Sequence, residues 1–381
     1  MPSRTTTSGE QSALPIWVEN GQIPLLNGLR AVAVIGVMLA HCCQTNGFPW
    51  SRTVAPLAVH GAIGVEIFFV LSGFLITTLL IRESNRTGRI NIPQFYLRRT
   101  LRIVPAYVCL LAVVAVMQTA GVASVTTPEW VAAGTYTVNF FPRPAWEIGH
   151  AWSLSIEEHF YLVWPFVFAL SGVLAARRLA ILCIAIAFLG RWVVLICLPE
   201  YTTMAELCTF TRMDTIAFGC LLALGIHDRS LRRHLNQLGQ IHGMPVVCIA
   251  AIVLTLCIGE FSTKVSVGLC MTTLGALLTL LMWSLLLRSE RSGVQWLNHP
   301  WLMRIGVCSY SIYLWQQLFL NPRTSAPWTA FPLNVVFALA AAWLSYRFIE
   351  RPCLKLKDRF SRSAASTAGA DPGWQISPTF R

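Results

Sequence analysis

GAIGVEIFFVLSGFLITTLLI, residues Gly61 to Ile81, is an apolar run that holds a single ionisable side chain, Glu66. A helix needs about 20 such residues to cross a hydrocarbon core roughly 30 Å thick. Similar runs recur along the chain and predict an all-α fold, a polytopic transmembrane bundle of about ten helices. The expected spans are Leu25–Cys43, Gly61–Ile81, Ile103–Gly121, Ala151–Leu170, Leu179–Leu198, Glu206–Ile226, Met244–Gly259, Val267–Leu287, Ile305–Leu320 and Phe331–Ile349.

The composition agrees with a chain whose solvent is the lipid bilayer. Of the 381 residues, 55% are hydrophobic and 12% are charged, whereas soluble domains have about 25% charged residues. The net charge of +12 does not indicate nucleic acid as a partner, because the basic residues lie in loops between apolar runs. Most of the 12 cysteines lie inside those runs without a Cys-x-x-Cys pair, so we expect neither a metal site nor a disulfide framework.

The distribution of Lys and Arg predicts the orientation in the membrane. One set of alternate connections is rich in basic residues and the other is poor, and the rich set is expected on the cytoplasmic side. This places both termini in the cytoplasm, which agrees with an even number of spans. The rich set holds Arg82, Arg86, Arg89, Arg98, Arg99, Arg102, Arg177, Arg178, Arg229, Arg232, Arg233, Arg288, Arg291, Arg351, Lys355, Lys357 and Arg359, and the poor set holds Arg52, Arg143, Lys264 and Arg323.

Three segments follow from these patterns. Residues 1–24 are polar and lack a signal-peptide pattern, so they are interpreted as a cytoplasmic tail. Residues 25–352 form the transmembrane domain, and residues 353–381 are interpreted as a basic, disordered cytoplasmic tail. The longest outer connection, Val122 to His150, carries aromatic residues that fit an interfacial belt or the rim of a binding site.

Arg30 and His41 are ionisable residues in the first apolar run, and a charge in the membrane costs a few kcal/mol. Their spacing of eleven positions brings both onto one face of a helix. A histidine satisfied by a neighbouring helix is the structural alternative. Because imidazole titrates near neutral pH, His41 is also the natural acceptor for the proton of a hydroxyl nucleophile.

Arg98, Arg99 and Arg102 cluster at the cytoplasmic mouth of the third span. They are explained either as charge that sets the topology or as a site for an anion such as a phosphorylated donor.

Three glutamates also lie in apolar surroundings: Glu66, Glu157 and Glu158. Together with Arg30 and His41 they are the candidate catalytic residues. A carboxylate beside His41 would fix its tautomer and raise its basicity, although an ion pair between spans is the structural alternative. Arg212 and Asp214 are two residues apart in the sixth span, so each is expected to pair with another helix.

Six motifs together resemble the acyltransferase family 3 membrane proteins, which are bacterial O-acyltransferases of polysaccharides, lipopolysaccharide, Nod factors, peptidoglycan or macrolides. The resemblance runs from about Leu25 to Pro352. The motifs are Leu26-Asn-Gly-Leu-Arg-Ala-Val-Ala-Val-Ile-Gly-Val-Met-Leu-Ala-His41, Phe68-Phe-Val-Leu-Ser-Gly-Phe-Leu-Ile76, Phe95-Tyr-Leu-Arg-Arg-Thr-Leu-Arg-Ile-Val-Pro105, Trp152-Ser-Leu-Ser-Ile-Glu-Glu158, Ser309-Tyr-Ser-Ile-Tyr-Leu-Trp315 and Ile349-Glu-Arg-Pro352.

The resemblance implies a ten-helix fold in the bacterial inner membrane, acyl-CoA (by default acetyl-CoA) as donor substrate, and a carbohydrate or glycolipid acceptor. It assigns the family's arginine and histidine to Arg30 and His41, its Arg-x-x-Arg pattern to Arg99 and Arg102, and its paired glutamates to Glu157 and Glu158. Two positions depart from the family pattern, since Asn27 replaces an aspartate and Gln316 replaces a histidine. An amide takes up no proton near neutral pH, so Gln316 is given no acid-base role.

The expected activity is therefore transfer of an acyl group from cytoplasmic acyl-CoA to a hydroxyl of a cell-surface or exported carbohydrate. In this hypothesis His41, oriented by Glu157 or Glu158, either deprotonates the hydroxyl or carries the acyl group. A transporter or flippase is the alternative class, although neither half of the chain repeats the other. A macrolide or a lipid-linked sugar is the alternative acceptor. The sequence does not indicate the oligomeric state.

Overall fold

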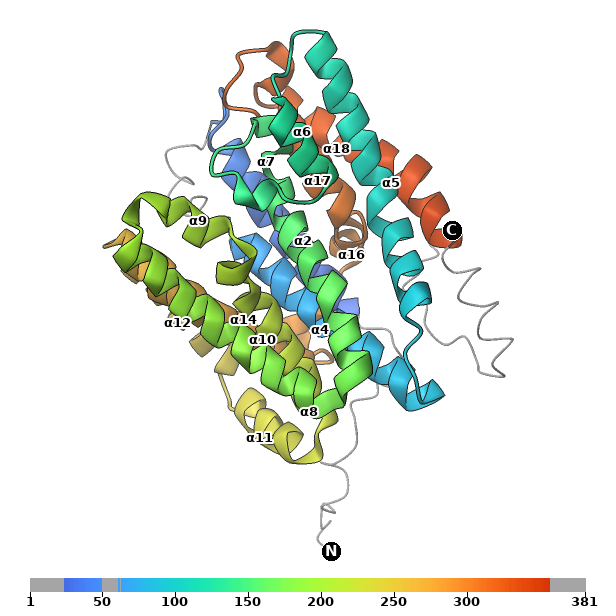
Figure 1. The fold of residues 1–381 in the computed structure, drawn as a ribbon, viewed down its shortest axis with the longest axis vertical. Coiled ribbons are helices and arrows are strands. Elements are labelled where there is room, and N and C mark those ends of the chain that lie inside the picture. Colours follow the sequence, from blue (N-terminus) through green and yellow to red (C-terminus); the bar gives the residue numbers. More distant parts are fainter. Residues whose placement is uncertain (1–23, 50–60, 62, 357–381) are drawn as a thin grey trace, which may run out of the picture.

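Long apolar helices form the body of the protein, and the polar connections gather at its two ends (Figure 1). The computed structural model describes residues 24–49, 61 and 63–356, and all regular elements within these ranges are helices. Seven helices are long and apolar enough to cross a membrane, or eight if α11 (Arg229–Gln240) and α12 (Met244–Gly259), bent by 82°, form one broken span. The predicted all-α polytopic class is confirmed, whereas the count of ten spans stays a prediction.

The remaining elements alternate between long helices and short connecting ones. The longer helices are α2 Pro24–Cys42, α4 Ile63–Thr87, α5 Ile92–Thr119, α8 Ala151–Cys197, α10 Thr209–His227, α14 Met271–Leu286, α16 Pro300–Val307, α17 Ser309–Phe319 and α18 Leu333–Ser345. The short ones are α6 Thr127–Gly134, η3 Val138–Phe140, α7 Trp146–Gly149, η4 Pro199–Tyr201, α9 Thr202–Leu207, α13 Thr263–Val265, η5 Ser266–Cys270, α15 Ser292–Gln295, η6 Trp296–Asn298, η7 Pro327–Thr329 and η8 Tyr346–Glu350.

Two expected spans, Ala151–Leu170 and Leu179–Leu198, lie in α8, which changes direction at Gly172 (Figure 1). Gly172 has φ 71° and ψ −173°, a conformation that is essentially restricted to glycine. The break occurs in one residue rather than in the eight-residue connection that the sequence suggested. The expected span Ile305–Leu320 is likewise divided, because α16 ends and α17 begins on either side of Cys308.

The outer surface of the bundle is apolar where a soluble protein would be polar. On α12, Val246 is 69% exposed and Leu254 is 60% exposed. Side chains of this kind on a helix surface are expected where the neighbour is lipid. The exposed apolar side chains therefore agree with a multi-pass membrane protein.

A very close helix contact joins α4 to α10 through a reciprocal pair of glycines. A Cβ atom added at Gly73 would lie 1.9 Å from the carbonyl oxygen of Ile216, and one added at Gly219 would lie 2.1 Å from that of Val70. Small residues let transmembrane helices approach until their backbones touch. This contact fixes α4 and α10 as the central pair of the bundle.

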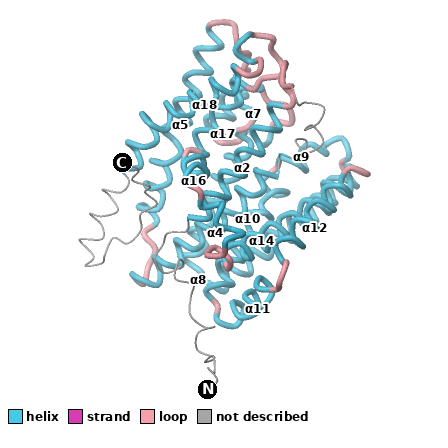
Figure 2. The backbone as a smooth tube through the Cα atoms, turned by 180° about the vertical axis from the view of Figure 1, so that it is seen from behind, coloured by secondary structure: helices cyan, strands magenta, loops and turns pink. Residues whose placement is uncertain are grey.

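Connections at the two ends follow the predicted alternation. Helix α11 and the turn between α4 and α5 lie at one end of the bundle, and α6 and α7 lie toward the other; the view from behind shows the same arrangement (Figures 1 and 2). We call the end with α11 and the turn between α4 and α5 the inner end, and the end with α6 and α7 the outer end. The cytoplasmic location of the inner end and of both termini stays a prediction. The two predicted tails lie outside the described residues, apart from residue 24 and residues 353–356.

Candidate functional site

His41 lies in the last turn of α2, toward the outer end of the bundle. Its ring meets the indole of Trp146 edge-on, with the two ring centroids 5.6 Å apart. The side-chain amide of Gln316, from α17, faces the imidazole without completing a hydrogen bond. The Nδ1 atom of His41 is buried and has no hydrogen-bond partner among the described residues. Because a buried polar atom without a partner is costly, this nitrogen has hydrogen-bonding capacity that the described residues do not use.

His150 is a second buried imidazole, directly before the first residue of α8. It is 3% exposed, interacts electrostatically with His41, and has no hydrogen-bond partner for either ring nitrogen within the described part of the chain. Its backbone carbonyl accepts hydrogen bonds from the hydroxyls of Tyr313 at 3.1 Å and Ser153 at 3.2 Å. The sequence did not indicate His150, because a histidine at the end of a loop is expected to be solvated and so to carry no free-energy cost of burial. The available signal was its place two residues before Trp152, the start of a motif.

A polar cluster lies further toward the inner end, around Arg99 of α5. The Arg99 guanidinium is 3.4 Å from a carboxylate oxygen of Glu157 and 3.6 Å from one of Glu158. It also stacks on the ring of Tyr161, 3.5 Å from the centroid. Ser72 of α4 donates a 2.7 Å hydrogen bond to Glu157. Three helices therefore converge on this one arginine.

Glu350 extends the same cluster from η8, a single π-helical turn at the end of α18. It is 3% exposed, accepts a 2.8 Å hydrogen bond from Ser311, and interacts electrostatically with Arg30 and Arg102. Turns of this kind re-aim a side chain within a helix and are frequent at functional sites. Sequence reasoning quoted the Ile349-Glu-Arg-Pro motif but gave Glu350 no role, because a carboxylate between two arginines at a span end resembles an interfacial residue.

These contacts differ from the predicted pairing of a glutamate with His41. We call the residues Arg30, Arg99, Arg102, Glu157, Glu158 and Glu350 the inner cluster, in which three guanidinium groups face three carboxylates. The two paired glutamates bond to Arg99 and, among the described residues, neither bonds to His41. The expectation that a glutamate orients the imidazole is therefore not met in the structure, and the neighbours of His41 are Trp146, Gln316 and His150.

Arg98 does not join Arg99 and Arg102. It forms an ion pair at 3.0 Å with Glu83, near the end of α4, and its side chain is 28% exposed. Arg99 and Arg102 interact instead with the carboxylates of the inner cluster, from which the Arg98 side chain is turned away toward Glu83. The predicted set of three arginines is thus divided between the cluster and the rim of the bundle.

Glu66 lies apart from both groups, between α4 and α10. It forms a buried ion pair with Arg212 and accepts a 2.8 Å hydrogen bond from Thr215. Asp214 pairs instead with the fully buried Arg191, at 2.6 Å. The prediction that Arg212 and Asp214 each pair with another helix is confirmed, and Glu66 has the contacts of a structural ion pair.

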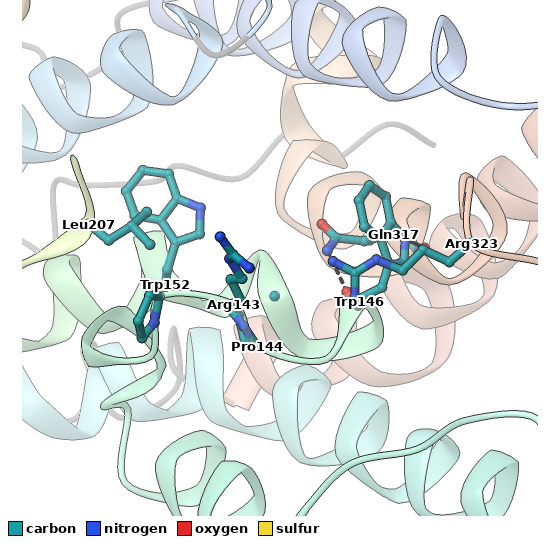
Figure 3. A pocket seen from close by; sticks show the side chains of 9 residues that line it. Arg143, Pro144, Trp146, Trp152, Leu207, Gln317 and Arg323 are labelled. Carbon is teal, nitrogen blue, oxygen red and sulfur yellow. Dashed lines mark hydrogen bonds between the residues drawn. The ribbon is translucent and has the colours of Figure 1, made fainter. Parts of the chain in front are cut away.

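A pocket opens at the outer end beside the histidines (Figure 3). Its volume is about 230 Å³. Trp146 lines it and also contacts His41, so the indole stands between the pocket and the imidazole. The lining residues are Pro142, Arg143, Pro144, Trp146, Gly149, Trp152, Leu207, Gln317 and Arg323.

The histidines and the inner cluster are stacked along shared helices. On α8, Ser153 beside His150 precedes Glu157 by four residues, and on α17, Ser311 beside Glu350 precedes Gln316 by five. At a rise of 1.5 Å per residue these offsets correspond to roughly 6 Å and 7.5 Å. The imidazoles and the inner cluster are therefore between one and two helical turns apart along these helices.

Comparisons with known proteins identify the family to which the chain is similar. The model of a family described as an acyltransferase domain matches residues 23–347. The O-acetyltransferase OatA of Staphylococcus aureus strain COL is 28% identical over 361 residues, covering 87% of this chain and 57% of the relative. A putative O-acetyltransferase of the same strain is 28% identical over 368 residues, with the same coverage of 87% and 57%. The chain thus spans somewhat over half the length of these relatives. No solved structure matches the chain.

The family match covers both histidines and all members of the inner cluster except Glu350. The family that the six sequence motifs predicted is confirmed. The chain therefore belongs to the family described as an acyltransferase domain.

Proposed function

We propose that this protein is an O-acetyltransferase of the bacterial plasma membrane. It takes an acetyl group from acetyl-CoA at the inner end and transfers it to a hydroxyl of a cell-surface or exported carbohydrate at the outer end. The names of the relatives support O-acetyl transfer. The polar groups that run from the inner cluster to the outer pocket support a donor and an acceptor that arrive from opposite sides.

One observation carries the proposal: His41 is buried between a pocket and an ionic cluster with its Nδ1 atom unpartnered. A core histidine with a purely structural role would have hydrogen bonds at its polar atoms. An imidazole that must accept a proton from a substrate needs a free nitrogen and a route for that substrate. In this proposal the substrate reaches the imidazole from the outer pocket, past the Trp146 indole that lines it and contacts His41.

The transfer can proceed in one step. An imidazole nitrogen of His41 accepts the proton of the acceptor hydroxyl as its oxygen attacks the thioester carbonyl. The new C–O bond forms, the C–S bond breaks, and the CoA thiolate leaves and recovers the proton from the imidazolium. In the two-step alternative the imidazole attacks the carbonyl first, CoA leaves, and the hydroxyl then takes the acetyl group from the acyl-imidazole.

The inner cluster is assigned to the donor. Arg99 and Arg102 are the candidate ligands of the CoA phosphates, and Arg98 assists from the rim. The carboxylates that face these arginines hold the guanidinium groups in place while the donor is absent, since an uncompensated buried charge is costly. Gln316 and His150 take the place beside His41 that sequence reasoning gave to a carboxylate.

The test uses purified protein in lipid vesicles with acetyl-CoA labelled in the acetyl group and a polysaccharide acceptor. We expect release of free CoA thiol together with label in the carbohydrate. Replacing Arg102 with Gln is expected to raise the KM for acetyl-CoA more than it lowers kcat, because ground-state binding of the donor is lost. The matched variant Arg229→Gln, on the exposed surface of α11, leaves both parameters unchanged. Absence of any thioester cleavage by folded protein contradicts the proposal.

A further inference from the structure

The outer pocket contains two tryptophans whose faces are held in position. The indole N–H of Trp146 donates a 2.8 Å hydrogen bond to the carbonyl of Gln317, and the Gln317 amide donates back to the carbonyl of Trp146. Trp152 stands on the other side of the pocket, next to Leu207 (Figure 3). Fixed indole faces offer large apolar contact at little cost in conformational entropy, which suits the C–H face of a sugar ring.

Two arginines share the pocket with these indoles. Arg143 stands between the two tryptophans, and the guanidinium of Arg323 lies 5.5 Å from the ring centroid of Trp146 (Figure 3). Both arginines are exposed, and neither forms an ion pair with a described carboxylate. Two guanidinium groups without a counter-charge at one pocket attract a bound anion.

The nearest acidic side chain is occupied elsewhere. Glu147 is 7% exposed and accepts a hydrogen bond from the side chain of Asn321 at 3.2 Å. The oxygen of the same Asn321 side chain accepts the backbone N–H of Arg323 at 2.8 Å. Asn321 therefore fixes the chain at Arg323 and bonds the carboxylate, and no ion pair neutralises the guanidinium.

The position of these arginines is unusual for a membrane protein. Basic residues are depleted from short outer connections, because they oppose the predicted orientation. The sequence places only four basic residues in that set, and two of them, Arg143 and Arg323, line this pocket. The distribution of charge that sets the membrane orientation does not explain why Arg143 and Arg323 lie here. Binding of a negatively charged ligand does explain it.

We propose that the outer pocket selects a carbohydrate acceptor that carries a carboxylate, an acidic sugar rather than a neutral one. The arginines bond the carboxylate in the fork geometry that guanidinium and carboxylate groups share. One indole stacks on the ring, and the hydroxyl to be modified is directed toward His41 past Trp146. This inference rests on the proposed function, because it treats the pocket as the acceptor site.

Equilibrium binding to the full-length protein in nanodiscs of neutral lipid tests the inference. The probes are a matched pair, an oligomer of hexuronic acid and the same oligomer with each carboxyl reduced to an alcohol. We expect the acidic probe to bind roughly tenfold more tightly at low ionic strength, with the difference shrinking as salt is added. Arg143→Gln and Arg323→Gln are each expected to remove most of this preference in protein whose thermal unfolding is unchanged.

Lys264→Gln is the control, since it removes another of the four basic residues that the sequence predicts for the outer connections, one that does not line the pocket. It is expected to keep the preference. Equal binding of both probes, or a preference that survives both arginine variants, overturns the inference. A preference that disappears when the nanodiscs contain anionic lipid assigns the arginines to lipid headgroups and also overturns it.

The binding measurement separates this inference from the proposed function. Acid-selective binding without acetyl transfer contradicts the proposed activity and leaves the pocket assignment standing. Acetyl transfer to acidic and neutral oligomers at equal kcat/KM, with equal binding, supports the activity and refutes the selection.

Discussion

Glu66 is the buried carboxylate whose contacts differ most from those expected of a catalytic residue. Its partners, Arg212 and Thr215, both come from α10, and neither borders the inner cluster. By contrast, Glu157, Glu158 and Glu350 gather arginines from α2 and α5. An ion pair shared by only two helices fits a role in packing, whereas carboxylates that collect charges from several helices fit a binding site.

A double-mutant cycle on Glu66 and Arg212 separates the two roles. Glu66→Gln leaves the Arg212 charge buried without compensation, and we expect it to lower the free energy of unfolding by about 3 kcal/mol. Adding Arg212→Met removes that charge and is expected to restore part of the stability, together with acyl transfer. Unfolding in detergent and transfer activity are measured on all four proteins. A double variant that is stable but inactive supports a catalytic role for Glu66 instead.

The sequence indicated ionisable residues that interrupt an apolar run, because a charge in the membrane costs free energy. It did not indicate residues whose role depends on contacts with another helix. Arg30 and His41 stand out because each interrupts an apolar run. His150 and Glu350 lie at the ends of spans, where a polar side chain costs little free energy. His150 is singled out by its proximity to His41, and Glu350 by its proximity to the arginines of other helices. A single sequence gives no distances between helices.

Among the elements, helix existence was predictable and helix breaks were not. Apolar length marks a span, but a one-residue reversal such as that at Gly172 needs only a positive φ and leaves no polar loop. The division at Cys308 is similar, since the residues on both sides are helical. Short breaks such as these give the bundle its shape without altering its hydropathy.

The contact between α4 and α10 predicts a strong effect of adding one methyl group. Gly73→Ala places a carbon against the backbone of Ile216, so the helices must separate. We expect a loss of about 1–3 kcal/mol or more, because backbone atoms cannot move aside as a side chain can. Gly134→Ala is the control, as no atom lies within 4 Å of the added carbon. Equal unfolding temperatures for the two variants contradict the reciprocal glycine contact.

The start of α11 provides a pH-dependent contact outside the spans. A hydrogen bond from Arg177, at 2.9 Å, lowers the pKa of Asp228, whose carboxylate also caps α11 by accepting backbone N–H groups at 2.9 and 3.2 Å. Because the folded pKa lies below the unfolded one, this stabilisation is present above the unfolded value of about 3.9 and is lost as the pH falls through the lowered value.

Hydrogen exchange of α11, corrected for the intrinsic rate at each pH, measures this effect. We expect faster exchange below pH about 4 in the wild-type protein. Asp228→Asn is expected to exchange at a rate that does not change over that range. An identical pH profile in both proteins shows that the Asp228 contact does not hold α11.

At the scale of the whole molecule, the number of crossings is the main open prediction. Ten spans require α12 to cross the membrane and to place the turn at Phe261 at the outer end, opposite α11. Epitope insertions after Gly121, Gln237, Phe261 and Arg291 test this by antibody access in spheroplasts. We expect access at Gly121 and Phe261 only. Access that is the same at Phe261 and Gln237 contradicts a crossing by α12 and removes the even count.

The arrangement of the whole bundle explains why function depends on few residues. The apolar exterior faces lipid, the α4–α10 pair fixes the centre, and the reactive groups follow α8 and α17 from the inner cluster to the outer pocket. In the proposed function, the donor and the acceptor then each need to reach only one end of the bundle. The imidazole of His41 is the group that links the two, so the account depends on it.

Acetyl transfer by His41→Ala protein tests the account most directly. The variant is compared with His234→Ala, which removes an exposed histidine from α11, in vesicles with labelled acetyl-CoA and an acidic oligosaccharide. We expect His41→Ala to fold, to lose transfer by about a hundredfold or more, and to regain part of it with added imidazole. His234→Ala is expected to keep full activity. Wild-type transfer by folded His41→Ala protein contradicts the central claim.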